Sequence, residues 1–201
     1  MTQPLRIGIF GGAFDPPHTA HRALVRAALD HLALDRLLII PTGQAWHKAR
    51  PLTAAHHRLA MARLCFSDLP QVQVDPLEIE RVGPSYTIDT LRALKAKWPE
   101  AELFLLMGED QARALDQWHD WQQIPQFATI CVAEREDSMR SGSQFEPAKS
   151  LGKRFVRLPV APMAVSATEI RARLGAHQNV DPLVFEPVAR YIEHHHLYQT
   201  D

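Results

Sequence analysis

The stretch Leu5-Arg-Ile-Gly-Ile-Phe10, continued by Gly11-Gly-Ala-Phe-Asp-Pro-Pro-His18-Thr-Ala-His21, decides the fold of this 201-residue chain. Its first part is short and apolar, which is typical of a buried strand, and Gly11-Gly12 predict a tight turn directly after it. Between Thr19 and Leu32, apolar residues fall in neighbouring rows at i, i+4 spacing, which predicts an amphipathic helix. The chain therefore opens with a strand, a glycine-rich turn and a helix.

Strand-like and helix-like segments alternate along the rest of the chain. Strands are expected at 36–41, 71–74, 77–80, 103–107, 128–133 and 155–158. Helices are expected at about 53–67 with Thr53 as N-cap, 87–97, from 110 through Trp118, 167–174 and 187–195. We read residues 134–153 as a flexible surface loop. This alternation predicts an α/β fold with an open, mostly parallel sheet covered by helices on both faces. In such sheets the ligand lies beyond the carboxyl ends of the strands, here at 11–21, 42–48 and 108–110.

Composition and charge exclude several classes of protein. With 46% hydrophobic and 22% charged residues, the chain has the composition of a globular protein. A formal charge of −1 gives no electrostatic support for binding a nucleic-acid polymer, and no apolar run is long enough to predict a membrane span. Two cysteines, Cys65 and Cys131, cannot form a disulfide scaffold. We expect a cytoplasmic protein without nucleic-acid or membrane partners.

The residues after the first strand predict a phosphate site. Gly11 and Gly12 allow a ligand to approach the backbone, while His18 and His21 share a face at the start of a helix. A helix N-terminus adds partial positive charge and free N–H groups. The spacing matches neither the G-x-G-x-x-G nor the Walker A pattern, so a dehydrogenase and a P-loop NTPase are not indicated. The two histidines lack the H-E-x-x-H spacing, and we expect no protein-held metal.

These motifs resemble those of a known family. The loop Gly11-Gly-Ala-Phe-Asp-Pro-x-His18-x-x-His21 resembles the G-x-F-D-P-x-H-x-x-H signature of nucleotidyltransferases, and Val165-Ser-Ala-Thr-Glu-Ile-Arg171 resembles their I-S-x-T-x-I-R motif. Ser85-Tyr-Thr87 and Gly108-x-Asp110 followed by Trp118 narrow the resemblance to the bacterial nicotinate-mononucleotide adenylyltransferases. The resemblance covers nearly the whole chain. It implies one Rossmann-like nucleotidyltransferase domain over residues 1–201, with a small helical C-terminal part from about residue 166.

The resemblance also implies a division of the site residues into two groups. The expected ATP-binding residues are Gly11, Gly12, Phe14, His18, His21, Lys48, Ser166, Thr168 and Arg171, of which His18, His21 and Arg171 are expected to be catalytic. The expected residues at the second substrate are Thr87, Ile88, Asp110, Trp118 and His119, with backbone N–H groups near Ile88 and His119 facing the nicotinate carboxylate. Asp15 is expected to hold the loop by hydrogen bonds, and Mg²⁺ to be carried by the ATP phosphates.

Three hypotheses for the function follow. The first is transfer of AMP from ATP to nicotinate mononucleotide, giving deamido-NAD and pyrophosphate, by a monomer or weak homo-oligomer. The second keeps the reaction but changes the acceptor to nicotinamide mononucleotide or phosphopantetheine. The third is a nucleotide-binding regulator without catalysis, against which His18, His21 and Arg171 argue.

Overall fold

The computed structural model describes residues 3–44, 51–135, 154–161 and 163–199. Its six strands form one parallel sheet in the order β3-β2-β1-β4-β5-β6. The strands are β1 (Arg6–Gly12), β2 (Arg36–Pro41), β3 (Val72–Val74), β4 (Glu102–Gly108), β5 (Ala128–Arg135) and β6 (Phe155–Val160). The helices are α1 (Thr19–Leu32), α2 (Ala55–Cys65), α3 (Leu77–Glu80), α4 (Thr87–Lys97), α5 (Glu109–Arg113), α6 (Ile124–Phe127), α9 (Ala167–Gly175) and α10 (Glu186–His194), with 3₁₀ turns η1 (Leu115–Gln117) and η2 (Trp121–Gln123).

The strand order confirms the predicted α/β fold and locates its ligand edge. The order reverses between β1 and β4, so the chain leaves these two neighbouring strands in opposite directions. Ligands of open parallel sheets bind at this reversal, beyond the carboxyl ends of the strands. The sequence predicts a turn at Gly11 and Gly12, and this prediction was wrong. Both residues continue β1, in register with Ile40 and Pro41 of β2. The turn begins only after them.

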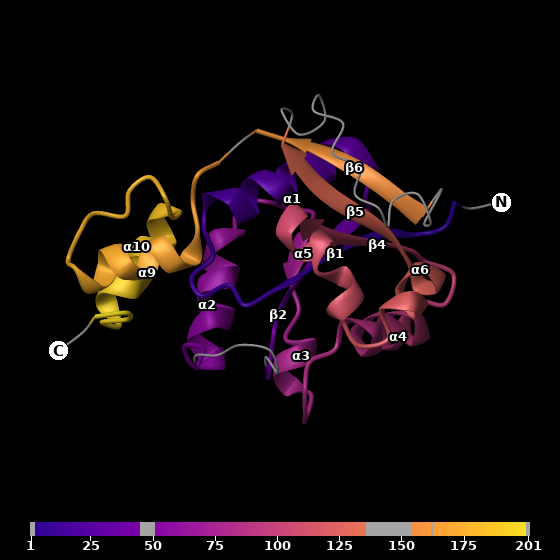
Figure 1. Cartoon of the computed structure of the whole chain (residues 1–201), viewed down its shortest axis with the longest axis horizontal. Coiled ribbons are helices and arrows are strands. Elements are labelled where there is room, and N and C mark those ends of the chain that lie inside the picture. Colours follow the sequence, from indigo (N-terminus) through magenta and orange to yellow (C-terminus); the bar gives the residue numbers. More distant parts are fainter. Residues whose placement is uncertain (1–2, 45–50, 136–153, 162, 200–201) are drawn as a thin grey trace.

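Helices cover both faces of the sheet, as Figure 1 shows. Successive strand residues point to opposite faces, so Ile9 and Phe10 of β1 belong to different apolar clusters. One cluster lies between the sheet and α1, α2 and α10; the other lies between the sheet and α4, α5 and α6. Near-continuous apolar strands such as Leu103–Met107 are required because both faces are buried.

Three further local predictions were wrong. Leu77–Glu80 forms helix α3, not a strand, because the Asp75 carboxylate accepts a hydrogen bond from Leu77 N (3.0 Å) and Pro76 starts a helical turn. Thr53 is not an N-cap, since α2 begins after Ala54. The helix expected from residue 110 ends at Arg113, and the following turns keep Leu115 in the core while Trp118 reaches the ligand edge.

The C-terminal part lies at one end of the molecule, where Figure 1 shows α9 and α10 beyond α2. Ile170, Val180 and Val184 form a small apolar cluster of their own. Helix α10 joins the main core through Val188 and Ile192. The segment is therefore both a separate helical layer and a continuation of the sheet's packing.

Both cysteines are buried and free. Cys65 ends α2 and Cys131 lies in β5, and both belong to the cluster beneath α1. Burial raises the pKa of each thiol to about 12. Within the described residues, no helix is long and apolar enough to cross a bilayer.

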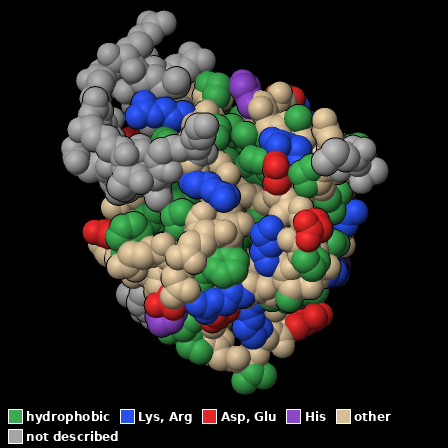
Figure 2. Space-filling view, turned by 90° about the vertical axis from the view of Figure 1, so that its right-hand side faces the viewer, with side chains coloured by type: hydrophobic (Ala, Val, Ile, Leu, Met, Phe, Trp, Pro, Cys, Tyr) green, Lys and Arg blue, Asp and Glu red, His purple; other side chains and the backbone are tan. Residues whose placement is uncertain are grey.

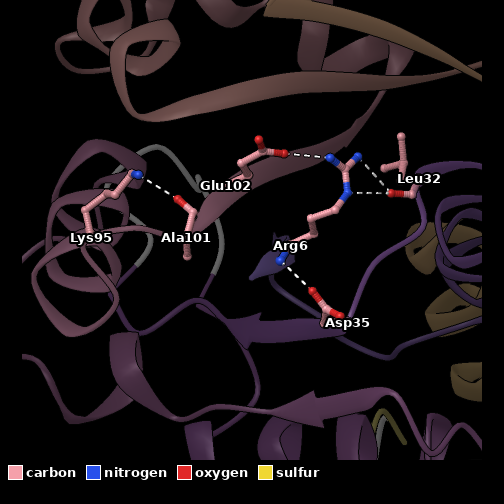
Figure 3. Close-up of polar contacts among 6 residues, drawn as sticks. All are labelled: Arg6, Leu32, Asp35, Lys95, Ala101 and Glu102. Carbon is pink, nitrogen blue, oxygen red and sulfur yellow. Dashed lines mark hydrogen bonds and ion pairs between the residues drawn. The ribbon is translucent and has the colours of Figure 1, made fainter. Parts of the chain in front are cut away.

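The amino ends of the strands are closed by paired polar groups, centred on Arg6 (Figure 3). Its guanidinium donates to Leu32 O at the end of α1 through Nε (3.3 Å) and Nη2 (3.0 Å). Its Nη1 binds Glu102 Oε2 at 2.6 Å, and its backbone N–H donates to Asp35 Oδ2 at 2.7 Å. These contacts join the starts of β1 and β4 to the end of α1.

The same pairing continues along this side of the molecule. Lys95 Nζ donates to the backbone oxygens of Ala101 (2.6 Å) and Pro99 (3.3 Å), which ties α4 to the start of β4. Figure 2, which views the molecule from this side, shows Lys and Arg side chains interspersed with Asp and Glu. No single sign of charge dominates the surface in that view.

Candidate active site

We use the name phosphate loop for residues 11–18, where the sequence predicts a phosphate site; the loop begins with the last two residues of β1. Gly11 is exposed, and a Cβ on it would meet only Ile40 O, at 3.9 Å, so the protein's own packing does not require glycine there. Phe14 is buried, with φ of 49° in the left-handed region, and its ring packs edge-on against Phe10 and Phe66. Phe14 therefore fixes the loop in the core, while Gly11 leaves backbone open to a ligand.

His18 and His21 form one structural unit at the start of α1. His18 is the N-cap, and its backbone N–H donates to His21 Nδ1 at 3.1 Å. The two rings stack with centroids 3.7 Å apart. The side chain of His18 is 7% exposed, and its Nδ1 has no hydrogen-bond partner among the residues described. An unsatisfied buried nitrogen is rare, and His18 belongs to the lining of the cavity described below.

Burial makes both imidazoles neutral in the protein alone. It lowers the pKa of His18 to about 4. The pKa of His21 is also lowered, first by burial and then by the neighbouring His18. A bound anion opposes both effects, because negative charge within a few ångström favours the protonated imidazole. The pair is therefore suited to a ligand that arrives with its own negative charge.

Arg171 reaches the same loop from α9. Its Nη1 donates to Asp15 O at 2.7 Å and its Nη2 donates to Thr168 Oγ1 at 3.0 Å. Ser166 is the N-cap of α9, and its Oγ accepts from Glu169 N at 3.2 Å. The first turn of a second helix thus points at the phosphate loop, where its N–H groups favour an anion.

A buried arginine that the sequence did not single out joins the loops behind the site. Arg58 of α2 is 2% exposed. Its Nη1 donates to Ala13 O at 3.0 Å and its Nε to Thr53 O at 2.8 Å. The backbone N–H of Thr53 in turn donates to Asp15 Oδ2 at 3.3 Å. This confirms that Asp15 holds the loop by hydrogen bonds. Arg58 binds the backbone of both segments that this contact joins, at Ala13 and at Thr53.

Aromatic groups gather at the other end of the site. Trp118 follows η1, and His119 stacks on Tyr86 with ring centroids 4.2 Å apart. Tyr86 is the N-cap of α4, so Thr87 is its first residue, in the turn whose N–H groups lack intrahelical acceptors. Asp110 lies in the first turn of α5, directly after β4.

One cavity of about 590 Å³ connects these groups. Its lining includes the predicted residues Gly11, Gly12, Phe14, His18, His21, Thr87, Asp110, Trp118, His119, Ser166, Thr168 and Arg171. Ile88 is fully buried in the core, and only the backbone role predicted for it remains open. Lys48 lies outside the described residues. The sequence motifs thus meet in a single space that extends from the imidazole pair to the indole.

Comparison with known proteins identifies the family of this chain. The cytidylyltransferase-like family model matches residues 9–173. A protein of Albidiferax ferrireducens named "Probable nicotinate-nucleotide adenylyltransferase" is 63% identical over 195 residues, covering 97% of this chain and 98% of its own. One of the same name from Methylibium petroleiphilum is 43% identical over 197 residues, covering 96% and 92%. This chain belongs to the nicotinate-nucleotide adenylyltransferase family.

A solved structure confirms the fold of this family member. The nicotinic acid mononucleotide adenylyltransferase of Plasmodium falciparum, complexed with NaAD, superposes with a TM-score of 0.80 at 19% identity, covering 96% of this chain and 97% of that one. At that identity the likeness concerns the fold alone. The family match ends at residue 173, shortly after Arg171, so it spans both nucleotidyltransferase motifs.

The cavity of this adenylyltransferase family member also contains groups that the sequence reading missed. Glu78 of α3 is buried, its carboxylate accepts a hydrogen bond from Thr90 Oγ1 at 2.7 Å, and both residues contribute to the lining. Burial raises the pKa of Glu78. The sequence predicts a strand at 77–80, and that prediction gives no reason to place the carboxyl of Glu78 at the site.

Proposed function

We propose that this protein transfers AMP from ATP to nicotinate mononucleotide, producing deamido-NAD and pyrophosphate. The observation that carries the proposal is the single cavity joining His18, His21 and Arg171 to the aromatic end around Trp118. A triphosphate suits the first group, because imidazoles and a guanidinium bind phosphate oxygens. A pyridine ring suits the second, because an indole face stacks on a cationic ring.

In this reaction the protein must align the two substrates and stabilise negative charge on the phosphates, and no general base is required. The phosphate of the mononucleotide is already an anion near neutral pH, and its oxygen attacks the α-phosphorus of ATP. The bond between the α-phosphorus and the oxygen that bridges the α- and β-phosphates breaks, and pyrophosphate leaves with the electron pair of that bond. Orientation of two substrates can contribute roughly 7–11 kcal/mol in favourable cases. His18 and His21 act on the phosphates near the leaving group, and Arg171 binds the β- or γ-phosphate.

Mg²⁺ is proposed to enter with ATP. The ion prefers oxygen ligands and is commonly bound through substrate phosphates. The lining at the proposed phosphate end includes two imidazoles and a guanidinium, whose nitrogens suit phosphate oxygens better than they suit Mg²⁺. In the described part of the chain, no cluster of three His, Cys, Asp or Glu residues could hold a metal. We propose that the phosphates carry the ion and that the protein contributes donors to the remaining oxygens.

At the other end, selection of the acid over the amide is proposed to rest on backbone donors. A carboxylate accepts hydrogen bonds only, whereas an amide also presents donors. The first turn of α4, at Thr87 and Ile88, and the backbone at His119 supply N–H groups beside the aromatic cluster. Asp110 is proposed to bind ribose hydroxyls. We further propose that the protein acts in the cytoplasm, as a monomer or weak homo-oligomer.

An acceptor comparison tests the function. Pyrophosphate release is measured with ATP and Mg²⁺ plus, in separate reactions, nicotinate mononucleotide, nicotinamide mononucleotide or phosphopantetheine. We expect the acid mononucleotide to give the highest kcat/KM and a product with the mass of deamido-NAD. A higher kcat/KM with another acceptor would reassign the substrate. Tight ATP binding without release for any acceptor would reject catalysis.

A further inference from the structure

A buried contact connects the end of the chain to the phosphate loop. Tyr198 follows the last helix, and its hydroxyl donates to Asp15 Oδ1 at 2.7 Å, across 183 residues of sequence. Asp15 is 2% exposed. Its other carboxylate oxygen accepts from Thr53 N at 3.3 Å. The carboxylate is therefore held on one side by the loop before α2 and on the other by the C-terminal segment.

The backbone around Tyr198 is shaped to make this contact. Tyr198 has φ of 65° and His196 has φ of 50°, both in the left-handed region that bulky residues rarely adopt. Between them, Leu197 N donates to Ile192 O at 3.0 Å, and both Leu197 and Tyr198 pack against the main core. Strained backbone of this kind costs about 1–3 kcal/mol and persists only where the surrounding contacts hold it.

The hydroxyl of Tyr198 is a permanent donor. Burial, the charge of Asp15 and the hydrogen bond to it raise the pKa of Tyr198 far above the ordinary value for tyrosine. The group thus stays protonated at any pH at which the protein works. Tyr198 does not belong to the residues that line the cavity, so it lies behind the site and not within it.

The same Asp15 is also the contact point for Arg171. The backbone oxygen of Asp15 accepts from Arg171 Nη1 at 2.7 Å, while the side chain of Asp15 accepts from Tyr198. His18 follows three residues later as the N-cap of α1. A displacement of Asp15 therefore changes the position of Arg171 relative to the imidazole pair.

We propose that Tyr198 is a positioning residue of the active site: its hydroxyl fixes Asp15, and through the carbonyl of Asp15 it fixes Arg171 against the ATP phosphates. This inference rests on the proposed function for its catalytic consequence. The C-terminal segment is then part of the machinery for adenylyl transfer, although it touches neither substrate.

A pair of single-hydroxyl deletions tests the proposal. Tyr198→Phe removes the donor to Asp15, whereas Tyr191→Phe removes the hydroxyl that lies 2.9 Å from His57 Nδ1 on the other side of the C-terminal segment. We expect Tyr198→Phe to lower kcat about tenfold and to raise the KM for ATP about threefold, with an unchanged KM for the mononucleotide. Misplaced catalytic groups give losses of this size. Tyr191→Phe should leave all three values within twofold of wild type.

Further measurements separate positioning from mere stabilisation. Calorimetric titration with ATP counts the competent sites, and kcat is then expressed per competent site. A structural role alone would lower the melting temperature and the number of sites but not kcat per site. Combining Tyr198→Phe with Asp15→Asn should cost less than the product of the two single losses, because both act through one contact.

The outcomes distinguish the inference from the function on which it rests. If wild type forms product and Tyr198→Phe retains kcat per site within twofold, or if Tyr191→Phe loses as much, the positioning role is wrong. If wild type binds ATP but forms no dinucleotide, the proposed function is wrong. The positioning role is then decided by the Kd for ATP, which we expect to rise about threefold in Tyr198→Phe only; an unchanged Kd would overturn it.

Discussion

The two ends of the parallel sheet treat their polar groups in opposite ways. At the amino ends, Arg6 uses its guanidinium on Leu32 O and Glu102, and its backbone N–H on Asp35. At the carboxyl ends, His18 keeps a buried ring nitrogen without a partner among the described residues. The contacts of Arg6 are satisfied within the protein, while the ring nitrogen of His18 is left for something that binds from outside.

The contrast follows from the chain's direction in a parallel sheet. Every strand of this sheet ends at the same edge, so the segments after β1 and β4 begin there together. The N-termini of α1 and α9 also face that edge, which concentrates N–H groups and partial positive charge. We therefore expect binding to be confined to the carboxyl edge and the contacts of the amino edge to contribute to stability alone. Four substitutions or conditions test this division, and they are given in order of decreasing effect.

The largest effect is expected from His18→Ala. One well-aimed donor is typically worth about 3–4 kcal/mol in the transition state, so turnover should fall about 100- to 1000-fold. The melting temperature should fall by only a few degrees, because the variant loses the buried ring and its stacking on His21, while Nδ1 has no partner to lose among the described residues. The assay is pyrophosphate release, with thermal unfolding measured on the same sample.

A matched histidine provides the control. His31 lies in the last turn of the same helix, toward the amino edge, with Nδ1 2.9 Å from Ala27 O. His31→Ala should leave turnover within twofold of wild type. Equal losses in the two variants would show that α1 as a whole, and not its carboxyl-edge end, carries the effect.

Acid should destabilise the protein through the same histidine. The pKa of His18 is about 4 in the folded protein and about 6.5 when unfolded. Between these values the unfolded chain binds the extra proton, so stability rises with pH and is lost as pH falls from about 6.5 to 4. The loss attributable to His18 is about 3 kcal/mol. Urea unfolding across this range should show a smaller loss in His18→Ala than in wild type; parallel curves would contradict the assignment.

Arg171→Lys should have an intermediate effect. Lysine keeps the charge but cannot bind Asp15 O and Thr168 Oγ1 with two nitrogens of one planar group. We expect kcat/KM for ATP to fall about tenfold or more. The control is Arg173→Lys. Arg173 lies two residues further along α9 and pairs with Glu169 at 2.7 Å, so this variant should change kcat/KM less than twofold. Indistinguishable variants would remove Arg171 from the phosphate site.

The smallest effect is expected at the amino edge. Arg6→Met removes two hydrogen bonds to Leu32 O and a partly exposed ion pair with Glu102. Such contacts contribute roughly 1 kcal/mol net, so the melting temperature should fall by a few degrees. Turnover at a temperature below unfolding should be unchanged. A tenfold loss of turnover in Arg6→Met would mean that the two edges are not independent.

What the sequence could predict depended on the length of the pattern. Helices α1 and α4 begin and end where their periodicity predicts, since each presents several turns of apolar face. Leu77–Glu80 offers four residues, too few to distinguish a strand from one helical turn, and the Asp75-Pro76 pair decided for the helix. Short segments are thus settled by local hydrogen bonds that the apolar pattern does not contain.

The site divides in the same way. The motifs around His18 and Arg171 could be identified from the sequence because the residues of each motif are close together along the chain. Arg58 was not, because it lies in α2 among polar residues and its role depends on Ala13 O and Thr53 O being brought to it by two separate loops. The contact between Tyr198 and Asp15 joins opposite ends of the chain and leaves no periodic trace.

The two buried cysteines can report when the folded structure opens. Cys65 ends α2 and Cys131 lies in β5, and both thiols belong to the apolar cluster beneath α1. A thiol reagent can modify either only after burial is lost, because each is fully enclosed and almost entirely protonated at neutral pH. Mass spectrometry of the two modified peptides would therefore show whether this cluster becomes exposed at α2 and at β5 at the same rate, without an introduced label.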